Sequence, residues 1–335
     1  MSGTDVPYQL RPNKFVERQL FLECLERLAF AKEISNYVYV SMGGRFLQDF
    51  QMMHSRFNLK DLVSIESDDI TYDRQVFNRP HSFILCQNQT SEEFITAFDS
   101  FADKYKKKNF AIWMDYASAK KRKSQLEELQ ELTSKLAAFD IVKVTLNANK
   151  STLGSQKNGE GQSELQVRRL GNLKSKLGDT FPDEPIASSE ITDVGFARIL
   201  ALSVKKSALK GLKGSPELSV VPIAQYRYQD GPHQMFTSTM VLWDQRKVES
   251  LKKKTGLNNW EYTAASWEDV RQIAIPDLSW KERIALNELI FSEPIEQVHA
   301  KLSFKLSKEN SRSLAALRQY VEHYRRIPGF VRAEI

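Results

Sequence analysis

Apolar residues along the chain follow two alternating spacings, and this pattern predicts a sheet covered by helices. Runs rich in valine, isoleucine and aromatic residues are typical of buried strands, and they occur at residues 37–40, 61–67, 81–88, 109–118 and 140–149. The intervening segments carry apolar residues every three or four positions, as helices do, at residues 46–57, 70–78, 91–107 and 123–139. Strands that alternate with helices favour a doubly wound α/β fold around a parallel sheet.

The segments that flank this alternation extend the predicted fold at both ends. Residues 13–27 predict a helix before the first strand, with Asn13 as its N-cap. After a helix at residues 192–209, two long strands are predicted within residues 218–243, joined at the turn sequence "DGPH". A Rossmann-like parallel sheet that ends in an antiparallel hairpin is the arrangement of class I S-adenosyl-L-methionine (SAM) methyltransferases.

These elements divide the chain into three parts. We expect an N-terminal helical segment at residues 1–35, a methyltransferase-like α/β domain at residues 36–243, and a mostly helical C-terminal extension at residues 244–335. Residues 150–189 are rich in Gly, Ser, Lys, Asp and Pro, and we interpret them as an insertion or lid.

Composition adds expectations about the compartment and about metals. No apolar run approaches the roughly 20 residues that span a bilayer, and the N-terminus lacks the apolar region of a signal peptide. Cys24 and Cys86 lie in apolar stretches and read as small core residues in a reducing compartment. We therefore expect a cytoplasmic protein with no membrane contact. The five histidines form no ligand-spaced pair, so we expect no metal site.

The net charge of +6 is concentrated in basic clusters. They lie at residues 104–108, 120–123, 205–206 and 252–254. Such clusters attract phosphate backbones, so RNA or DNA is one candidate partner. Solvated helix faces or loops are the alternative interpretation of each cluster.

The ends of the predicted strands carry the candidate cofactor residues, because ligands of open α/β sheets bind at that edge. Gly43 and Gly44 would allow close approach of the backbone to a ligand. Glu66 follows Gly44 by 66 − 44 = 22 residues, close to the ~20 expected for a carboxylate that binds ribose hydroxyls. A plain turn is the alternative interpretation of the two glycines. The full set of candidate cofactor residues is Ser41, Met42, Gly43, Gly44, Glu66, Gln87 and Asn88.

Several common ligands are disfavoured by the same stretch. The G-x-G-x-x-G fingerprint of dinucleotide sites is missing, and bulky Phe46 and Leu47 follow the glycines. The chain contains neither a P-loop nor a G-x-S-x-G hydrolase motif. SAM carries no phosphate and tolerates a less regular turn, so we expect SAM.

Asp115 follows the fourth strand, where methyltransferases place a residue that faces the transferable methyl group. A carboxylate there would orient an acceptor hydroxyl or amine and accept its proton; a helix cap is the alternative. Tyr116 would line the pocket or pack in the core. The sequence after Asp115 is Tyr-Ala-Ser, which lacks the Pro-Pro motif of enzymes that methylate nucleobase nitrogens, so oxygen is the favoured acceptor atom.

Five blocks of the sequence resemble a known family. They are "LRPNKFVERQLFLECLERL", "YVYVSMGGRFLQDFQMMH", "LVSIESD", "FNRPHSFI" and "IWMDYAS". In this order they resemble a bacterial family described as putative O-methyltransferases, with R-P-x-K-x-x-E-R, S-I-E and W-x-D-Y among its motifs. The resemblance covers roughly residues 10–150 and implies a class I methyltransferase fold with a SAM site.

The first block also contains candidate catalytic residues. Lys14 and Arg18 lie one helical turn apart, with Glu17 beside them. A surface ion-pair cluster and a clamp over the strand ends are the two interpretations. Lys14, Asp115 and Lys143 also resemble three of the four catalytic residues of RNA ribose 2′-O-methyltransferases. The fourth is a glutamate near the hairpin, where this chain offers only Asp230, and Lys143 could instead lie on the outer face of its strand.

Two functions from different classes follow. The first is a SAM-dependent methyltransferase, O-directed, with a nucleic acid as the favoured acceptor and Asp115, Lys14 and Tyr116 as catalytic residues. The second is a non-catalytic subunit of a bacterial antiviral defence or toxin system, which keeps the fold and binds nucleic acid or a nucleotide beside a protein partner. A degenerate pocket would show bulky side chains in the space beside Gly43, and this feature separates the two hypotheses.

Overall fold

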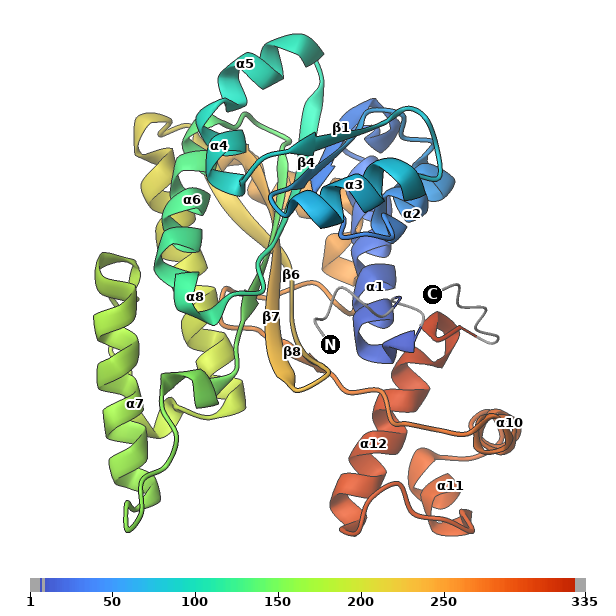
Figure 1. Cartoon of the computed structure of the whole chain (residues 1–335). Coiled ribbons are helices and arrows are strands. Elements are labelled where there is room, and N and C mark those ends of the chain that lie inside the picture. Colours follow the sequence, from blue (N-terminus) through green and yellow to red (C-terminus); the bar gives the residue numbers. More distant parts are fainter. Residues whose placement is uncertain (1–6, 8–9, 329–335) are drawn as a thin grey trace.

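The computed structural model describes residue 7 and residues 10–328, which form an eight-stranded mixed sheet between two layers of helices (Figure 1). The order of the strands is β3-β2-β1-β4-β5-β7-β6-β8, with β7 antiparallel to both of its neighbours. Their bounds are β1 Tyr37–Ser41, β2 Leu62–Glu66, β3 Ile84–Asn88, β4 Asn109–Asp115, β5 Ile141–Asn147, β6 Leu218–Asp230, β7 His233–Asp244 and β8 Arg271–Ile273. The predicted Rossmann-like sheet with its terminal antiparallel hairpin is confirmed.

The two faces of the sheet bury separate hydrophobic clusters because side chains alternate along each strand. Tyr37 and Tyr39 of β1 face the first cluster, whereas Val38 and Val40 face the second. The first is covered by α1 (Pro12–Ala29), α2 (Gln48–Phe57), α9 (Val248–Thr255), α10 (Trp280–Leu289), α11 (Ile295–Lys301) and α12 (Asn310–His323). The second is covered by α4 (Ser91–Thr96), α5 (Phe98–Ala102), α6 (Arg122–Lys135), α7 (Gln162–Leu177) and α8 (Asp193–Gly211). Helix α3 (Asp69–Asn78) connects β2 to the edge strand β3.

Helix α1 belongs to the first core cluster. Its residues Val16, Leu20 and Leu25 are fully buried there, against side chains of β4 and β6. The predicted N-cap is wrong: the helix begins at Pro12 with Arg11 at the N-cap position. Asn13 instead donates to the Gln229 carbonyl oxygen (3.1 Å) and accepts from the Ile275 amide (2.7 Å). The first turn of α1 is thereby tied to the end of β6 and to the segment after β8.

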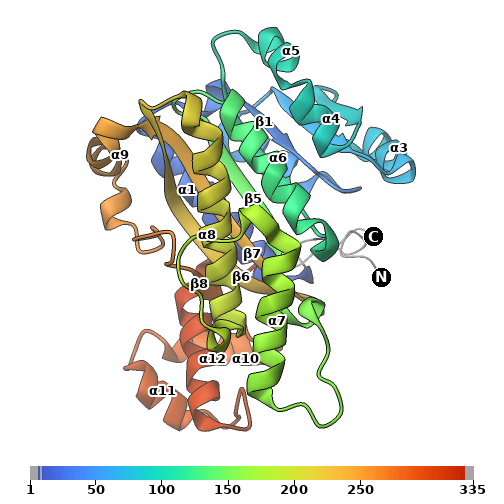
Figure 2. The same cartoon turned by 90° about the vertical axis from the view of Figure 1, so that its left-hand side faces the viewer.

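The inserted segment at residues 150–189 folds around α7. Leu165, Leu173 and Leu177 of this helix are buried, and α7 lies beside α6 and α8 (Figure 2). This layer covers the face of the sheet opposite α1. The segment therefore contributes to the helical layer on that face.

The C-terminal extension is mostly helical, as expected, but it also contributes strand β8. This strand pairs in parallel with β6, with Tyr226 opposite Arg271. Three residues are too few to show an alternating pattern, so the sequence gives no strand signal there. Leu251, Leu286 and Leu317 of the extension are buried in the cluster that also contains α1.

The two cysteines are free thiols. Cys24 is fully buried, as expected of a core residue, whereas Cys86 on the edge strand β3 is only half-buried and packs against the core. No helix within the described residues has the length and apolar character needed to cross a membrane.

Candidate active site

The residues expected at the strand ends lie along one edge of the sheet. Ser41 of β1 pairs with Ser64 of β2 and with Trp113 of β4. Glu66 and Asp115 therefore both lie two residues beyond the level of Ser41. The parallel register brings the three predicted strand ends to one edge, as a ligand site of this fold requires.

The two glycines after β1 play different roles. Gly44 has a left-handed backbone (φ +52°), and a side-chain carbon placed on it would meet no atom within 4 Å. A carbon on Gly43 would lie 2.4 Å from Cε2 of Phe50 and 2.6 Å from Cδ2 of Leu47. The space beside Gly43 is thus filled by core side chains, whereas Gly44 faces open space. Helix α2 starts only at Gln48, so the predicted helix begins two residues too early.

Glu66 lies between the end of β2 and the start of α3. Its Oε1 accepts from the backbone amide of Asp68 at 3.0 Å, and Asp68 in turn caps α3 by accepting from the Thr71 amide. Burial raises the pKa of Glu66 above its ordinary value, although backbone hydrogen bonds partly oppose this. Beside it, the Asn88 side chain donates to Asp69 at 2.7 Å. The carboxylate expected to bind ribose is therefore held at the sheet edge by the first turn of α3.

Asp49 is a site candidate that sequence reasoning missed. It lies in the first turn of α2 and is 3% exposed. Its Oδ2 accepts from the Tyr39 hydroxyl at 2.9 Å, while Oδ1 has no hydrogen-bond partner among the described residues. Burial raises the pKa of its carboxyl group. The motif "LQDF" holds an acid 49 − 44 = 5 residues after Gly44, and that spacing is the only sequence signal for this residue.

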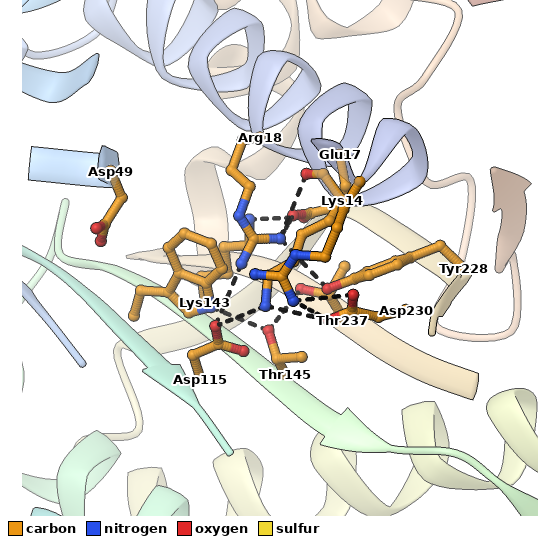
Figure 3. Close-up of polar contacts among 12 residues, drawn as sticks. Lys14, Glu17, Arg18, Asp49, Asp115, Lys143, Thr145, Tyr228, Asp230 and Thr237 are labelled. Atoms are coloured by element: carbon orange, nitrogen blue, oxygen red, sulfur yellow. Dashed lines mark hydrogen bonds and ion pairs between the residues drawn. The ribbon is translucent and has the colours of Figure 1, made fainter. Parts of the chain in front are cut away.

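A buried polar cluster lies where α1 crosses the strand ends (Figure 3). We define it as Lys14, Glu17, Arg18, Asp115, Lys143 and Asp230. Asp115 Oδ2 lies 3.2 Å from Arg18 Nη2 and 3.8 Å from Lys14 Nζ. Lys14 also reaches Asp230 at 3.3 Å, at the end of β6. The interpretation of the α1 charges as a surface cluster is wrong, because Glu17 and Arg18 are each 1% exposed.

Lys143 is the most deeply buried cation of the cluster. Its side chain is fully buried and points from β5 toward α1, so the interpretation that it lies on an outer face is wrong. Its Nζ lies 2.6 Å from Glu17 Oε1 and within 4.1 Å of the ring centres of Trp113 and Phe21. Burial lowers the pKa of Lys143 to about 8, although the charge of Glu17 opposes the shift.

The cluster keeps Asp115 ionised. Burial alone would raise the pKa of Asp115, but the charges of Lys14, Arg18, Lys143 and Arg11 outweigh it and lower the pKa below its ordinary value. The pKa of Lys14 is lowered, chiefly by burial. The arrangement therefore joins an ionised carboxylate to two lysines that lose their protons more easily than usual.

Tyr116, the neighbour of Asp115, lies outside this cluster. It packs in the cluster on the opposite face of the sheet, where its hydroxyl donates to Glu128 of α6. Met42 packs against the same opposite cluster. Gln87 of β3 accepts a hydrogen bond from Gln89 at 2.8 Å. Consecutive strand residues face opposite sides, so Asp115 and Tyr116 do not contribute to the same face.

The structure also has a large groove away from the strand ends. Its volume is about 1100 Å³, and it is lined by residues of α1, of α12 and of several connecting segments, among them Phe15, Tyr262, Phe291 and Tyr324. None of the residues expected to bind the cofactor or the acceptor lines this groove.

The strand order and the polar edge of the sheet define a class I methyltransferase fold, and SAM is the cofactor of this class. The chain belongs to the family described as "Putative O-methyltransferase", whose model matches residues 6–335. The predicted family membership is therefore confirmed over nearly the whole chain. No curated protein matches the sequence.

Two solved structures show distant likeness to the chain. One is the plantazolicin methyltransferase BamL in complex with a triazolic desmethylPZN analog and SAH. It is 13% identical, with a TM-score of 0.33, and the match covers 70% of this chain and 88% of BamL. The other is a mutant 16S rRNA (adenine(1408)-N(1))-methyltransferase from Catenulisporales acidiphilia with SAM. It is 11% identical, with a TM-score of 0.29, covering 64% of this chain and 90% of that chain. Likenesses this distant say nothing about the acceptor of this chain.

Proposed function

We propose that the chain is a cytoplasmic, O-directed SAM-dependent methyltransferase. The observation that carries the proposal is the buried polar cluster, in which Asp115 remains ionised between Lys14 and Arg18 at the strand ends. Burying so many charges is costly unless each is paired. A cluster of this kind at the ligand edge of the fold is typical of a site that handles protons.

The residues at the sheet edge fit the proposed cofactor. Glu66 would accept from the ribose hydroxyls, since a carboxylate offers two acceptors to a diol. Asp49 Oδ1, a buried acceptor without a partner in the described residues, would accept from the amino group of the methionine part. Open space at Gly44 would admit the ligand beside the backbone of Ser41 and Met42, and Gln87 with Asn88 would flank the base. When bound, SAM supplies an electrophilic methyl group.

The polar cluster would prepare the acceptor. The ionised Asp115 carboxylate would accept a hydrogen bond from the acceptor hydroxyl and fix its orientation, which supplies much of the rate of an in-line transfer. The oxygen gives up its proton as it is methylated. Asp115 would accept this proton, and Lys14, whose Nζ lies 3.8 Å from Asp115 Oδ2, would stabilise its carboxylate. Lys143 is fully buried behind Glu17, so it would act through the charge network instead of touching the acceptor.

A nucleic-acid acceptor is supported by part of the basic surface only. Lys120 and Lys121 are exposed in the segment that follows β4 and lie near the sheet edge that carries Asp115. In the cluster on α8, by contrast, Lys205 pairs with Glu184 and Lys206 with Asp183. We therefore propose that Lys120 and Lys121 hold the phosphate backbone of an RNA or DNA acceptor. Their replacement by glutamine should weaken binding and reduce its salt dependence.

Calorimetric titration with SAM tests the cofactor assignment. Wild type should release heat with a single-site isotherm, and Glu66→Ala should lose most of the affinity because the ribose hydroxyls lose their acceptor. Glu92→Ala is the matched control, since Glu92 is an exposed glutamate on α4. The cofactor assignment is wrong if wild type gives no heat, or if Glu66→Ala and Glu92→Ala bind SAM with equal affinity.

A second candidate function is favoured by the glycine turn. The degenerate-pocket hypothesis predicts bulky side chains beside Gly43, and Leu47 and Phe50 occupy that space. On this proposal the chain is a non-catalytic subunit of a bacterial defence or toxin system that binds nucleic acid and a protein partner. It predicts purified protein with a high 260/280 nm absorbance ratio and no heat on titration with SAM. Heat with SAM and a protein-like absorbance ratio would reject it.

A further inference from the structure

Helix α3 is unusual because its large apolar residues face solvent. Ile70 is 72% exposed and Phe77 is 88% exposed. The one buried residue of the helix is the polar Gln75, whose Oε1 accepts from the Ser64 hydroxyl at 2.9 Å. An amphipathic helix of a globular protein normally turns its apolar stripe toward the core. Here a large apolar stripe lies on the outer face, which indicates a surface for association.

The exposed face of α3 has a regular order. Ile70 and Phe77 are seven residues apart and therefore share one face of the helix, with Asp73 and Arg74 between them. Neither charged residue forms an ion pair within the described part of the chain. Along the stripe, an apolar residue is followed by an acidic and a basic residue and then by a second apolar residue. The net charge of the stripe is therefore zero.

The neighbouring sheet edge extends this surface. Strand β3 follows α3 and has no pairing partner on its outer side within the described residues. Phe83 and Leu85, just before and within β3, are also partly exposed. Soluble proteins usually protect such edges with charged residues, proline or a cover. Five large apolar residues between positions 70 and 85, namely Ile70, Val76, Phe77, Phe83 and Leu85, are thus exposed around one edge of the sheet.

We propose that α3 packs against α3 of a second copy of this chain, antiparallel and about a two-fold axis. In that arrangement Ile70 of each copy meets Phe77 of the other, and Asp73 of each copy meets Arg74 of the other. A two-fold contact requires a self-complementary patch, and this stripe has that property. A phosphate backbone or an anionic membrane is a poor match, because the stripe is neutral and Asp68 and Asp69 are at its N-terminal end.

The contact would also stabilise the proposed cofactor edge. Asp68 at the start of α3 donates its amide to Glu66, and Asn78 at its end donates to the Arg45 carbonyl oxygen at 3.0 Å in the glycine turn. Packing of α3 would restrain both. The dimer itself does not depend on the proposed function, because its test measures mass only.

Sedimentation velocity over a concentration series tests the proposal. One short helix and a strand edge give a small interface, so wild type should pass from monomer to dimer at about micromolar concentrations. Phe77→Asp should raise the dissociation constant at least about tenfold, since it places a charge in the apolar contact. Phe30→Asp is the matched control, because Phe30 is 70% exposed at the end of α1, and it should dimerise like wild type.

A charge exchange makes the test specific for a contact between identical copies. Asp73→Arg should abolish the dimer, because four arginines would then meet at the axis. The double variant Asp73→Arg/Arg74→Asp should restore it, because each acid again faces a base. The proposal is overturned if wild type stays monomeric at every concentration. This outcome includes the case in which the stripe binds a different protein. The proposal is also overturned by a Phe77→Asp protein that dimerises as well as wild type, or by a double variant that fails to recover while its circular dichroism matches wild type.

Discussion

Replacement of Lys143 by methionine isolates the cost of burying a charge in the polar cluster. The lysine is fully buried, and its pKa of about 8 lies below the ordinary 10.5 because burial disfavours the ammonium form. The unfolded chain then holds its proton more tightly than the folded chain between about pH 8 and pH 10.5. The free energy of unfolding of wild type therefore gains a stabilising contribution from Lys143 as the pH rises through this window.

The size of the effect follows from the two pKa values. With a folded pKa of about 8 and an unfolded pKa of 10.5, the contribution of Lys143 rises by about 2 kcal/mol between about pH 7 and pH 9.5. Burial raises the pKa of Cys24 to about 12, and this acts in the opposite direction above about pH 9. Both proteins retain the buried thiol, so the difference between wild type and Lys143→Met removes the part of this effect that burial causes. The charge of Lys143 itself lowers the pKa of Cys24, so the remaining part belongs to the substitution.

Urea unfolding followed by tryptophan fluorescence measures this difference, and Trp113 beside Lys143 reports on the site itself. The free energy of unfolding of wild type minus that of Lys143→Met should increase by about 2 kcal/mol from about pH 7 to pH 9.5. Lys60→Met, at an exposed lysine, should track wild type at both pH values. If the difference in free energy of unfolding between the two proteins stays constant across this pH window, the reasoning is refuted, since Lys143 would then not titrate there.

Two further predictions concern the strand ends. Asp115→Asn should slow methyl transfer by about 10²- to 10⁴-fold with little change in SAM affinity, because the acceptor loses an ionised partner; single-turnover transfer and calorimetry measure the two effects separately. Gly43→Ala should lower the free energy of unfolding by about 2–3 kcal/mol, because the added methyl would lie 2.4 Å from Phe50. Gly44→Ala, where the methyl meets open space and only the left-handed backbone is strained, should cost about 1 kcal/mol. Equal losses for the two glycine variants would contradict the packing argument.

The order of the elements was accessible from the sequence because it rests on local patterns. Apolar runs and helical spacing predicted all five parallel strands and the closing hairpin, and the family blocks agreed with them. Glu66 and Asp115 were found for the same reason, since the residue after a buried run marks a strand end. Element boundaries were less accurate. The glycine turn continues to Leu47, which adopts a left-handed backbone (φ +49°) that no residue pattern signals.

Contacts between distant segments could only come from the tertiary structure. The sequence placed Lys14, Glu17 and Arg18 on one helix, but whether that helix was exposed or buried depended on its packing against β4 and β6. The partner of Lys143 is Glu17, 126 residues earlier by subtraction, and no local rule connects the two. The sequence also did not determine which face of the sheet each side chain points to. Asp115 and Tyr116 are adjacent in the chain, yet Asp115 lies in the polar cluster and Tyr116 in the core on the opposite face.

By itself, then, the sequence determined the fold class, the family and the edge of the sheet where a ligand would bind, because strand–helix alternation and motif order are encoded residue by residue. Only the tertiary structure decided which charges meet. It buried the α1 charges against Lys143 and Asp115, filled the space beside Gly43, and left the apolar stripe of α3 in solvent. These outcomes depend on burial and pairing across the chain, and burial is a property of the packed molecule that no single segment carries.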